Sequence, residues 1–167
     1  MAVGRRIRFF RLRENMTQKE LGLLLGFSEK TAEVRVNQYE NEYRLPKEDT
    51  LKKLGKIFHV APDVFKVPNI DTVAGVMQTF FALEDFHGVR VAQMDNKLVL
   101  VINDGGLESQ QHFNHTVLKE WLMQRLALEE GRLSKEEYDA WRYNYTEKNV
   151  EEHLKNLYKE IYGAELF

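Results

Sequence analysis

The sequence predicts a mainly α-helical protein, with five short helices first and then a helical region that contains one β-hairpin. Up to about residue 65, apolar residues recur every three or four positions with short breaks. Strand-type sequence occurs only in two runs on either side of Asp95-Asn96. Between these parts, Pro68-Asn69 is a turn signal. We therefore expect domains at 1–66 and 71–167, joined by a short linker.

Composition limits where the protein acts. Of the 167 residues 43% are apolar, which is ordinary for a packed core, and none is Cys. Disulfides and thiolate metal sites are thus excluded. No apolar run approaches the roughly 20 residues that span a bilayer, and the N-terminal segment is too charged for a secretory signal. We expect a soluble, cytoplasmic protein.

Charge is divided unevenly along the chain. Residues 1–66 carry 14 Lys/Arg and 9 Asp/Glu, a balance of +5, whereas residues 67–167 carry 10 and 17, a balance of −7. A polyanion is attracted to the first part and repelled by the second. Nucleic acid is therefore a plausible partner of the N-terminal part only.

Local signals are dense in the first two helices. The first helix is expected at about 4–14, and Asn15, which tolerates left-handed backbone, ends it. Thr17 and Glu20 have the spacing of a capping box that begins the second helix. The expected buried stripe of this helix comprises Leu21, Leu24 and Leu25.

Three more helices complete the N-terminal part. In the third, Val36 and Tyr39 are three apart and should both pack inward. Pro46 breaks the chain, and "APDVF" at 61–65 reads as a short fifth helix. The fourth helix between them is defined by Leu51, Leu54, Ile57 and Phe58.

The order "IRFFRLRENMTQKELGLLLGF…QYENEYRLP…LKKLGKIFHVAPDVF" resembles the Cro/C1-type (XRE) helix-turn-helix domain of phage repressors and bacterial regulators, over about residues 4–65. The resemblance implies a five-helix DNA-binding domain. Asn15, Glu42 and His59 stand where the family commonly has Gly. Asn and His tolerate left-handed backbone, but Glu42 leaves the shape of its loop open.

The resemblance also implies how DNA is bound. The third helix would enter the major groove, and the N-terminus of the second would face a phosphate. Gln18 would fix the register on the backbone. Glu33 would either accept from a cytosine amine or lie outside the interface. The family's base-reading positions fall on Glu33, Val34, Arg35, Asn37 and Gln38, and its phosphate contacts on Arg44, Lys47 and, if the first helix lies against DNA, Arg5, Arg6 and Arg8.

The segment between Gly26 and "QYE" is about four residues longer than is usual in the family. With Ser28 as the cap, the extra residues prolong the third helix, and Lys30 and Thr31 reach DNA. With Thr31 as the cap, they form a loop. We favour the first version.

The C-terminal part combines helices with the hairpin. We expect a helix from Asp71, a hairpin at about 88–103, a short helix capped by Ser134 and Glu137, and a last helix after Thr146. Between the hairpin and Gly131, a longer helix carries Phe113, Val117, Trp121, Leu122 and Leu126 along one face, and the last helix carries Val150, Leu154, Leu157 and Ile161.

One helix-turn-helix reads about half a turn of DNA, so proteins of this class usually bind as two-fold dimers. The C-terminal part is the candidate for dimerisation or sensing. Its hairpin either extends a sheet across the two-fold axis or closes its own core. Its aromatic residues either line a site for an unidentified small-molecule or peptide effector or form a core.

Signals for catalysis are poor. His112 and His115 lie near Glu108, but no third ligand follows at a convincing spacing, and the "NDGG" of 103–106 lacks the downstream Lys of a phosphate loop. We expect no enzyme activity, no metal and no cofactor.

The predicted function is a sequence-specific DNA-binding transcriptional regulator, a repressor that binds a pseudo-palindromic operator as a homodimer. The alternative is an antitoxin-like protein-interaction module, in which the helix-turn-helix serves autoregulation.

Overall fold

The computed structural model describes the chain except residues 1–2, 69, 103–107, 147, 153–154 and 156–167, and for 108–116 it describes the backbone alone. The described residues are mainly helical with one two-stranded hairpin, which confirms the predicted fold class. The chain divides into two compact units, Met1–Val76 and Met77–Phe167. The domain limits of 1–66 and 71–167 stay a prediction.

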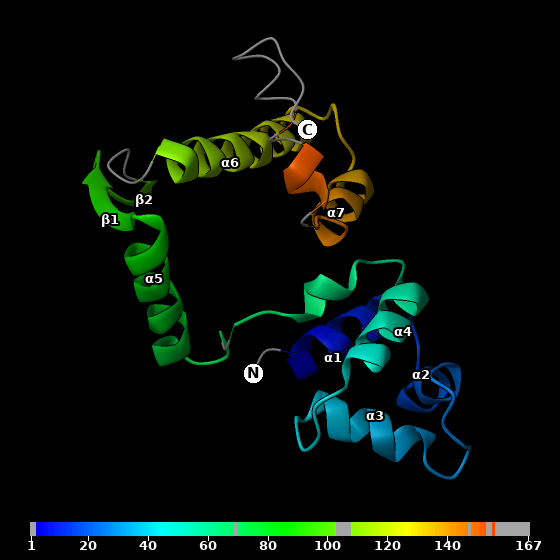
Figure 1. Cartoon of the computed structure of the whole chain (residues 1–167). Helices are drawn as coiled ribbons and strands as arrows, with labels where there is room; N and C mark the ends of the chain where they lie inside the picture. The colour runs from blue at the N-terminus through cyan, green and yellow to red at the C-terminus, as the bar shows by residue number, and fades with distance from the viewer. Residues whose placement is uncertain (1–2, 69, 103–107, 147, 153–154, 156–167) are drawn as a thin grey trace. The chain divides into compact units, whose positions relative to one another are not determined.

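The first unit packs four α-helices and one 3-10 helix around a single core (Figure 1). Phe10 lies at the centre, with ring centroids 5.8 Å from Phe58 and 5.7 Å from Phe65. The fully buried side chains also include Ile7, Leu21, Val36 and Leu54. The elements are α1 (Val3–Arg13), α2 (Gln18–Leu24), α3 (Ala32–Glu40), α4 (Glu48–Phe58) and the 3-10 helix η1 (Pro62–Phe65).

The three positions where the family commonly has Gly all have left-handed backbone. Asn15, Glu42 and His59 have φ of 54°, 59° and 54°. Glu42 has a specific use for its side chain, because its carboxylate accepts a hydrogen bond from the backbone N–H of Gly4 at 3.1 Å. It thereby satisfies an unpaired donor at the N-terminus of α1, which offsets part of the cost of a left-handed glutamate.

The predicted capping box of α2 is confirmed, but one member of its expected stripe is wrong. Thr17 Oγ1 accepts from the Glu20 N–H, and the Glu20 carboxylate accepts from the Thr17 N–H. Leu21 and Leu25, one turn apart, are buried, whereas Leu24 is 57% exposed. The α-helix ends at Leu24, so the stripe is limited to the i, i+4 pair.

The extra residues before α3 form a turn, and the favoured leading turn of helix is wrong. The helix begins at Ala32 with Thr31 as its N-cap. The Ser28 carbonyl accepts from the N–H groups of both Thr31 and Ala32 at 2.9 Å. The Ser28 hydroxyl lies 2.9 Å from the Thr31 hydroxyl. Because the two hydroxyls bond to each other, Ser28 does not cap a longer helix.

The second unit contains most of α5, the hairpin, and the helices α6 and α7. Two residues with positive φ, Asp95 at 48° and Asn96 at 63°, make the predicted tight turn. The α5 helix begins at Val73, two residues after the expected start, with the Thr72 hydroxyl accepting from the Gly75 N–H at 3.0 Å. The elements after the first unit are α5 (Val73–His87), β1 (Val89–Met94), β2 (Lys97–Ile102), α6 (Glu108–Glu129) and α7 (Lys135–Tyr143).

The predicted helix ends of the second unit are confirmed where the structure describes them. Gly131 has φ 72° after α6, and Ser134 and Glu137 form a capping box at α7. Of the last helix, residues 148–152 are helical and Val150 is buried. The predicted residues Leu154, Leu157 and Ile161, the side chains of Glu108, His112, Phe113 and His115, and the "NDGG" of 103–106 lie outside the described residues.

The expected apolar face of α6 is mostly not buried. Trp121 and Leu122 are 51% and 55% exposed, Leu126 is exposed, and Val117 is half-buried. None of the helices in the described parts of the chain is both long and apolar enough to cross a membrane.

Candidate nucleic-acid interface

The α3 helix has one buried face and one outward face. Ala32, Val36, Tyr39 and Glu40 are buried. At 3.6 residues per turn, Val34 lies opposite this stripe, and it is 57% exposed. The remaining predicted base-reading residues share the outward side: Glu33 and Asn37 are exposed, and Arg35 and Gln38 are half-buried.

The predicted phosphate-contact residues beyond α3 are also exposed. Arg44 follows the helix, and its backbone N–H donates to the Gln38 carbonyl at 3.2 Å. This bond fixes the chain directly after α3. Lys47 is exposed at the N-terminus of α4.

Gln18 connects the start of α2 to α3. Its side-chain N–H₂ donates to the Glu40 carboxylate at 2.7 Å. Its side-chain oxygen lies 3.5 Å from the Asn37 amide nitrogen, at the long limit of a hydrogen bond. Gln18 is half-buried. The structure thus brings together Gln18, the predicted contact to the DNA backbone, and Asn37, one of the predicted base-reading residues.

A buried ion pair between Arg11 and Glu40 holds Gln18 in this position. The Arg11 guanidinium donates to both carboxylate oxygens of Glu40, at 2.6 and 3.1 Å, and to the Met16 carbonyl at 2.7 Å. The two side chains are 9% and 3% exposed. Arg11, Glu40 and Gln18 therefore link α1, α2 and α3 in one network.

Arg11 and Glu40 were not predicted as functional residues, although the sequence carries a signal for Arg11. Arg11 follows Ile7 by four residues, so it lies on the buried stripe of α1. A charged residue on such a stripe needs a buried partner. Nothing in the sequence identifies Glu40 as that partner, because the two are 29 residues apart.

At the N-terminus of α2 a carboxylate is held in place. The Thr17 backbone N–H, and then the Thr17 hydroxyl, hold the pKa of Glu20 below its ordinary value. The Glu20 carboxylate is therefore ionised at neutral pH, and it accepts the hydrogen bond of the Thr17 backbone N–H. A phosphate at this helix end would have to use other donors.

The other predicted DNA contacts lie in the turn before α3 and on α1. Lys30 and Thr31 are exposed in the turn before α3. On α1, Arg8 is exposed. Arg5 pairs with Asp71 at 3.3 Å. Arg6 donates to the Val64 carbonyl at 3.1 Å and lies 5.3 Å from the centre of the Phe10 ring, so it packs on its own unit.

A comparison with protein families agrees with this geometry. Residues 7–65 match a family model described as helix-turn-helix. A solved structure described as transcriptional regulator BswR is 26% identical over 50% of this chain and 93% of that chain, with a TM-score of 0.38. No curated protein matches the sequence. No group of three or more side chains that could hold a metal occurs in the part of the chain that the structure describes.

Proposed function

Residues 7–65 belong to the Cro/C1-type (XRE) helix-turn-helix family, and on that premise we propose that the chain is a sequence-specific transcriptional repressor that binds its operator as a homodimer. The observation that carries the proposal is the outward face of α3, where the predicted reading residues are exposed or half-buried and the opposite face of the helix joins a buried network. Helix-turn-helix domains place such a helix in the major groove.

The polar residues on the outward face of α3 contact the bases. Arg35 has the donors to pair with guanine, and Gln38 or Asn37 can pair with adenine through both donor and acceptor. Each good pair contributes about 1–3 kcal/mol of discrimination between bases. Glu33 either accepts from a cytosine amine or remains outside the interface, because it repels phosphate.

Backbone contacts supply the rest of the affinity. We assign them to Gln18, Lys30, Thr31, Arg44 and Lys47, which are exposed or half-buried in the first unit. This part of the chain carries the surplus of Lys and Arg. Binding should therefore weaken steeply as salt is added, because counterions are released from DNA.

The homodimer is supported by apolar surface in α5 and the hairpin. None of the fifteen residues of α5 is buried, although most of them are apolar. Helices that are apolar on all sides are normally covered. On one hairpin face Val91, Leu98 and Leu100 are 65%, 80% and 57% exposed. We propose that a second copy of the chain covers this surface.

The test of the reading face is the double variant Arg35→Ala/Gln38→Ala, titrated on DNA selected from a random pool by the wild-type chain. Affinity should fall at least about tenfold, since two base contacts of about 1–3 kcal/mol each are removed. Lys148→Ala, which removes one exposed cation of the second unit, is the control and should bind like wild type. Unchanged affinity of the double variant would show that α3 does not read bases.

The same apolar surface keeps the antitoxin-like alternative open, because a partner protein could cover it instead of a second copy. Sedimentation of the purified chain separates the two proposals. A dimer that binds operator DNA supports the repressor, whereas a monomer that associates only with the product of a neighbouring gene supports the antitoxin.

A further inference from the structure

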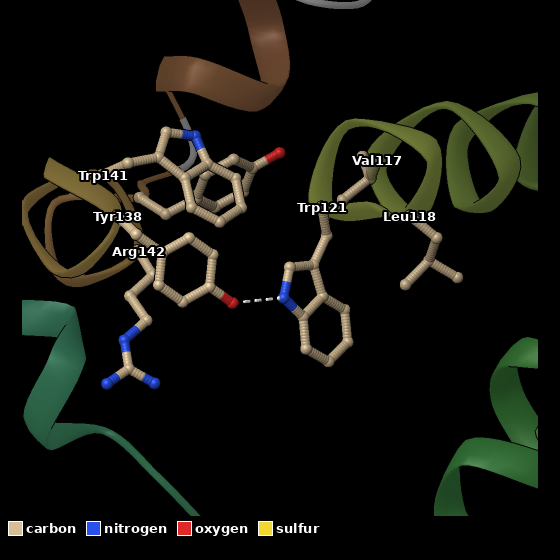
Figure 2. A pocket seen from close by; sticks show the side chains of 7 residues that line it. Val117, Leu118, Trp121, Tyr138, Trp141 and Arg142 are labelled. Atoms are coloured by element: carbon tan, nitrogen blue, oxygen red, sulfur yellow. Dashed lines mark hydrogen bonds between the residues drawn. The ribbon is translucent and has the colours of Figure 1, made fainter. Parts of the chain in front are cut away.

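A hollow of about 290 Å³ lies between α6 and α7 in the second unit. Figure 2 shows Val117, Leu118 and Trp121 reaching it from α6, and Tyr138, Trp141 and Arg142 from α7. Tyr145, just after α7, is the seventh lining residue. Six of the seven side chains are apolar or aromatic, which is typical of sites for small organic molecules.

The polar atoms of the lining indoles are already hydrogen-bonded. The Trp141 ring also packs against the rings of Tyr138 and Tyr145, with centroid distances of 5.9 and 5.5 Å, whereas Trp121 is 51% exposed and leaves ring surface for a ligand. Trp121 Nε1 donates to the Tyr138 hydroxyl at 2.9 Å (Figure 2). Trp141 Nε1 and the Tyr145 hydroxyl donate to the two carboxylate oxygens of Glu120, at 3.1 and 3.2 Å. The rings are fixed by these bonds, and the surfaces they present are flat and apolar.

One donor at the hollow remains unused. The Tyr138 side chain is 5% exposed, and its oxygen accepts the bond from Trp121. Within the described residues, the structure gives no acceptor for the Tyr138 hydroxyl hydrogen. A buried hydroxyl that lacks an acceptor is a favourable partner for a ligand oxygen or nitrogen lone pair.

Charge indicates which ligands are disfavoured. Among the described residues that line the hollow, Arg142 is the charged one. Its guanidinium is 5.5 Å from the centre of the Tyr138 ring, and the cationic groups of Lys135 and Arg125 are each 5.9 Å from the same centre. The carboxylates of this region already bind donors: Asp139 pairs with Lys135 and Arg142, Glu129 with Arg125, and Glu120 with Trp141 and Tyr145. The donors of Trp141 and Tyr145 are neutral, so they do not cancel the charge of Glu120. The charged side chain in the lining itself is Arg142, and a cation in the hollow would meet its guanidinium directly.

We propose that this hollow binds a small planar molecule of two fused aromatic rings that carries a hydrogen-bond acceptor and is neutral or anionic. An apolar cavity of about 150 Å³ holds benzene, so 290 Å³ has room for a second ring. The rings stack on Trp121, and the acceptor receives the Tyr138 hydroxyl hydrogen. The proposal is independent of DNA binding, because neither the site nor its test involves the first unit.

The probe is sodium 2-naphthoate, titrated into the full chain by calorimetry and by NMR of the indole N–H resonances. The chain has two tryptophans, and both line the hollow, so their two N–H signals report on this site alone. Both signals should shift with the dissociation constant that calorimetry gives. The cation 2-naphthylmethylammonium should bind at least tenfold more weakly.

Two variants locate the ligand. Tyr138→Phe should weaken 2-naphthoate about tenfold and leave naphthalene, which lacks an acceptor, unchanged; this comparison removes any general effect of the variant on the fold. Val117→Phe should fill the hollow and abolish binding. Met123→Phe, which introduces the same side chain at an exposed α6 residue outside the lining, should bind like wild type.

Three outcomes overturn the proposal. They are no shift of either indole signal at millimolar 2-naphthoate, equal loss of both ligands in Tyr138→Phe, and stronger binding of the cation than of the anion.

Discussion

The guanidinium of Arg11 is held by both oxygens of Glu40, and the same carboxylate holds Gln18. The position of Gln18, a predicted DNA contact, thus depends on the buried Arg11–Glu40 ion pair. At this scale the sequence predicted the packing of Val36 and Tyr39, because their spacing on one helix is local information. It could not predict the Arg11–Glu40 pair, which depends on how two helices cross.

Glu40→Ala should destabilise the first unit by about 3–5 kcal/mol, because it leaves the buried charge of Arg11 without a partner. Urea unfolding followed by circular dichroism measures this loss. Glu33→Ala, an exposed carboxylate on the same helix, is the matched control and should change stability by no more than about 0.5 kcal/mol. Equal effects of the two variants would mean that the pair contributes nothing.

Helix ends were predicted well wherever a local rule applies. The capping boxes of α2 and α7 depend on residues three positions apart, and the left-handed backbone of Asn15 and Gly131 depends on the residue type alone. The start of α3 was predicted wrongly for a related reason: both Ser28 and Thr31 can cap a helix, and their hydroxyls bond to each other. The residue preferences at helix N-caps do not decide between Ser28 and Thr31, because both side chains can cap a helix.

The capping box of α2 should make stability depend on pH. The Thr17 hydrogen bonds lower the pKa of Glu20 in the folded state below its ordinary value of about 4.5. The ionised carboxylate therefore stabilises the fold above that value, and this contribution is lost as pH falls through the lowered pKa. Glu20→Gln should cost stability at neutral pH and less at about pH 3.

Melting temperatures of wild type and Glu20→Gln at the two pH values test this dependence. Glu29→Gln, at an exposed carboxylate in the turn before α3, is the control and should show a small difference at both. A Glu20→Gln difference that grew on acidification would have the wrong sign.

The turn before α3 should contribute one phosphate contact. Lys30→Ala should weaken binding to all DNA sequences alike and reduce the slope of log affinity against log salt by about one. Titrations at several salt concentrations measure the slope, with Lys148→Ala as the control. If Lys30→Ala kept the wild-type slope, the turn would not touch DNA.

For the whole molecule, the sequence indicated two parts of opposite charge but not how much apolar surface the second would expose. The apolar residues of α5, β2 and α6 have the spacing of core residues, yet Leu98 is 80% and Phe86 72% exposed. Periodicity shows that a face will be covered without showing whether the same chain covers it. The homodimer was expected from the family resemblance, and the exposed apolar surface is the observation that supports this proposal.

Leu98→Lys/Leu100→Lys should convert the proposed dimer to a monomer and lower operator affinity, because like charges would meet across a two-fold interface. Sedimentation equilibrium measures the mass. Met94→Lys adds a charge at an exposed apolar residue on the other hairpin face and should leave the dimer intact. A double variant that sediments like wild type would place the interface elsewhere.

The most direct test of the central claim is selection of DNA from a random pool by the purified full chain, followed by sequencing. The account predicts enrichment of one pseudo-palindromic site whose half-sites lie about one helical turn apart, bound by two copies of the chain. It further predicts that Arg35→Ala/Gln38→Ala loses the enrichment. A wild-type chain that enriches no sequence, or a double variant that enriches the same site, would contradict it.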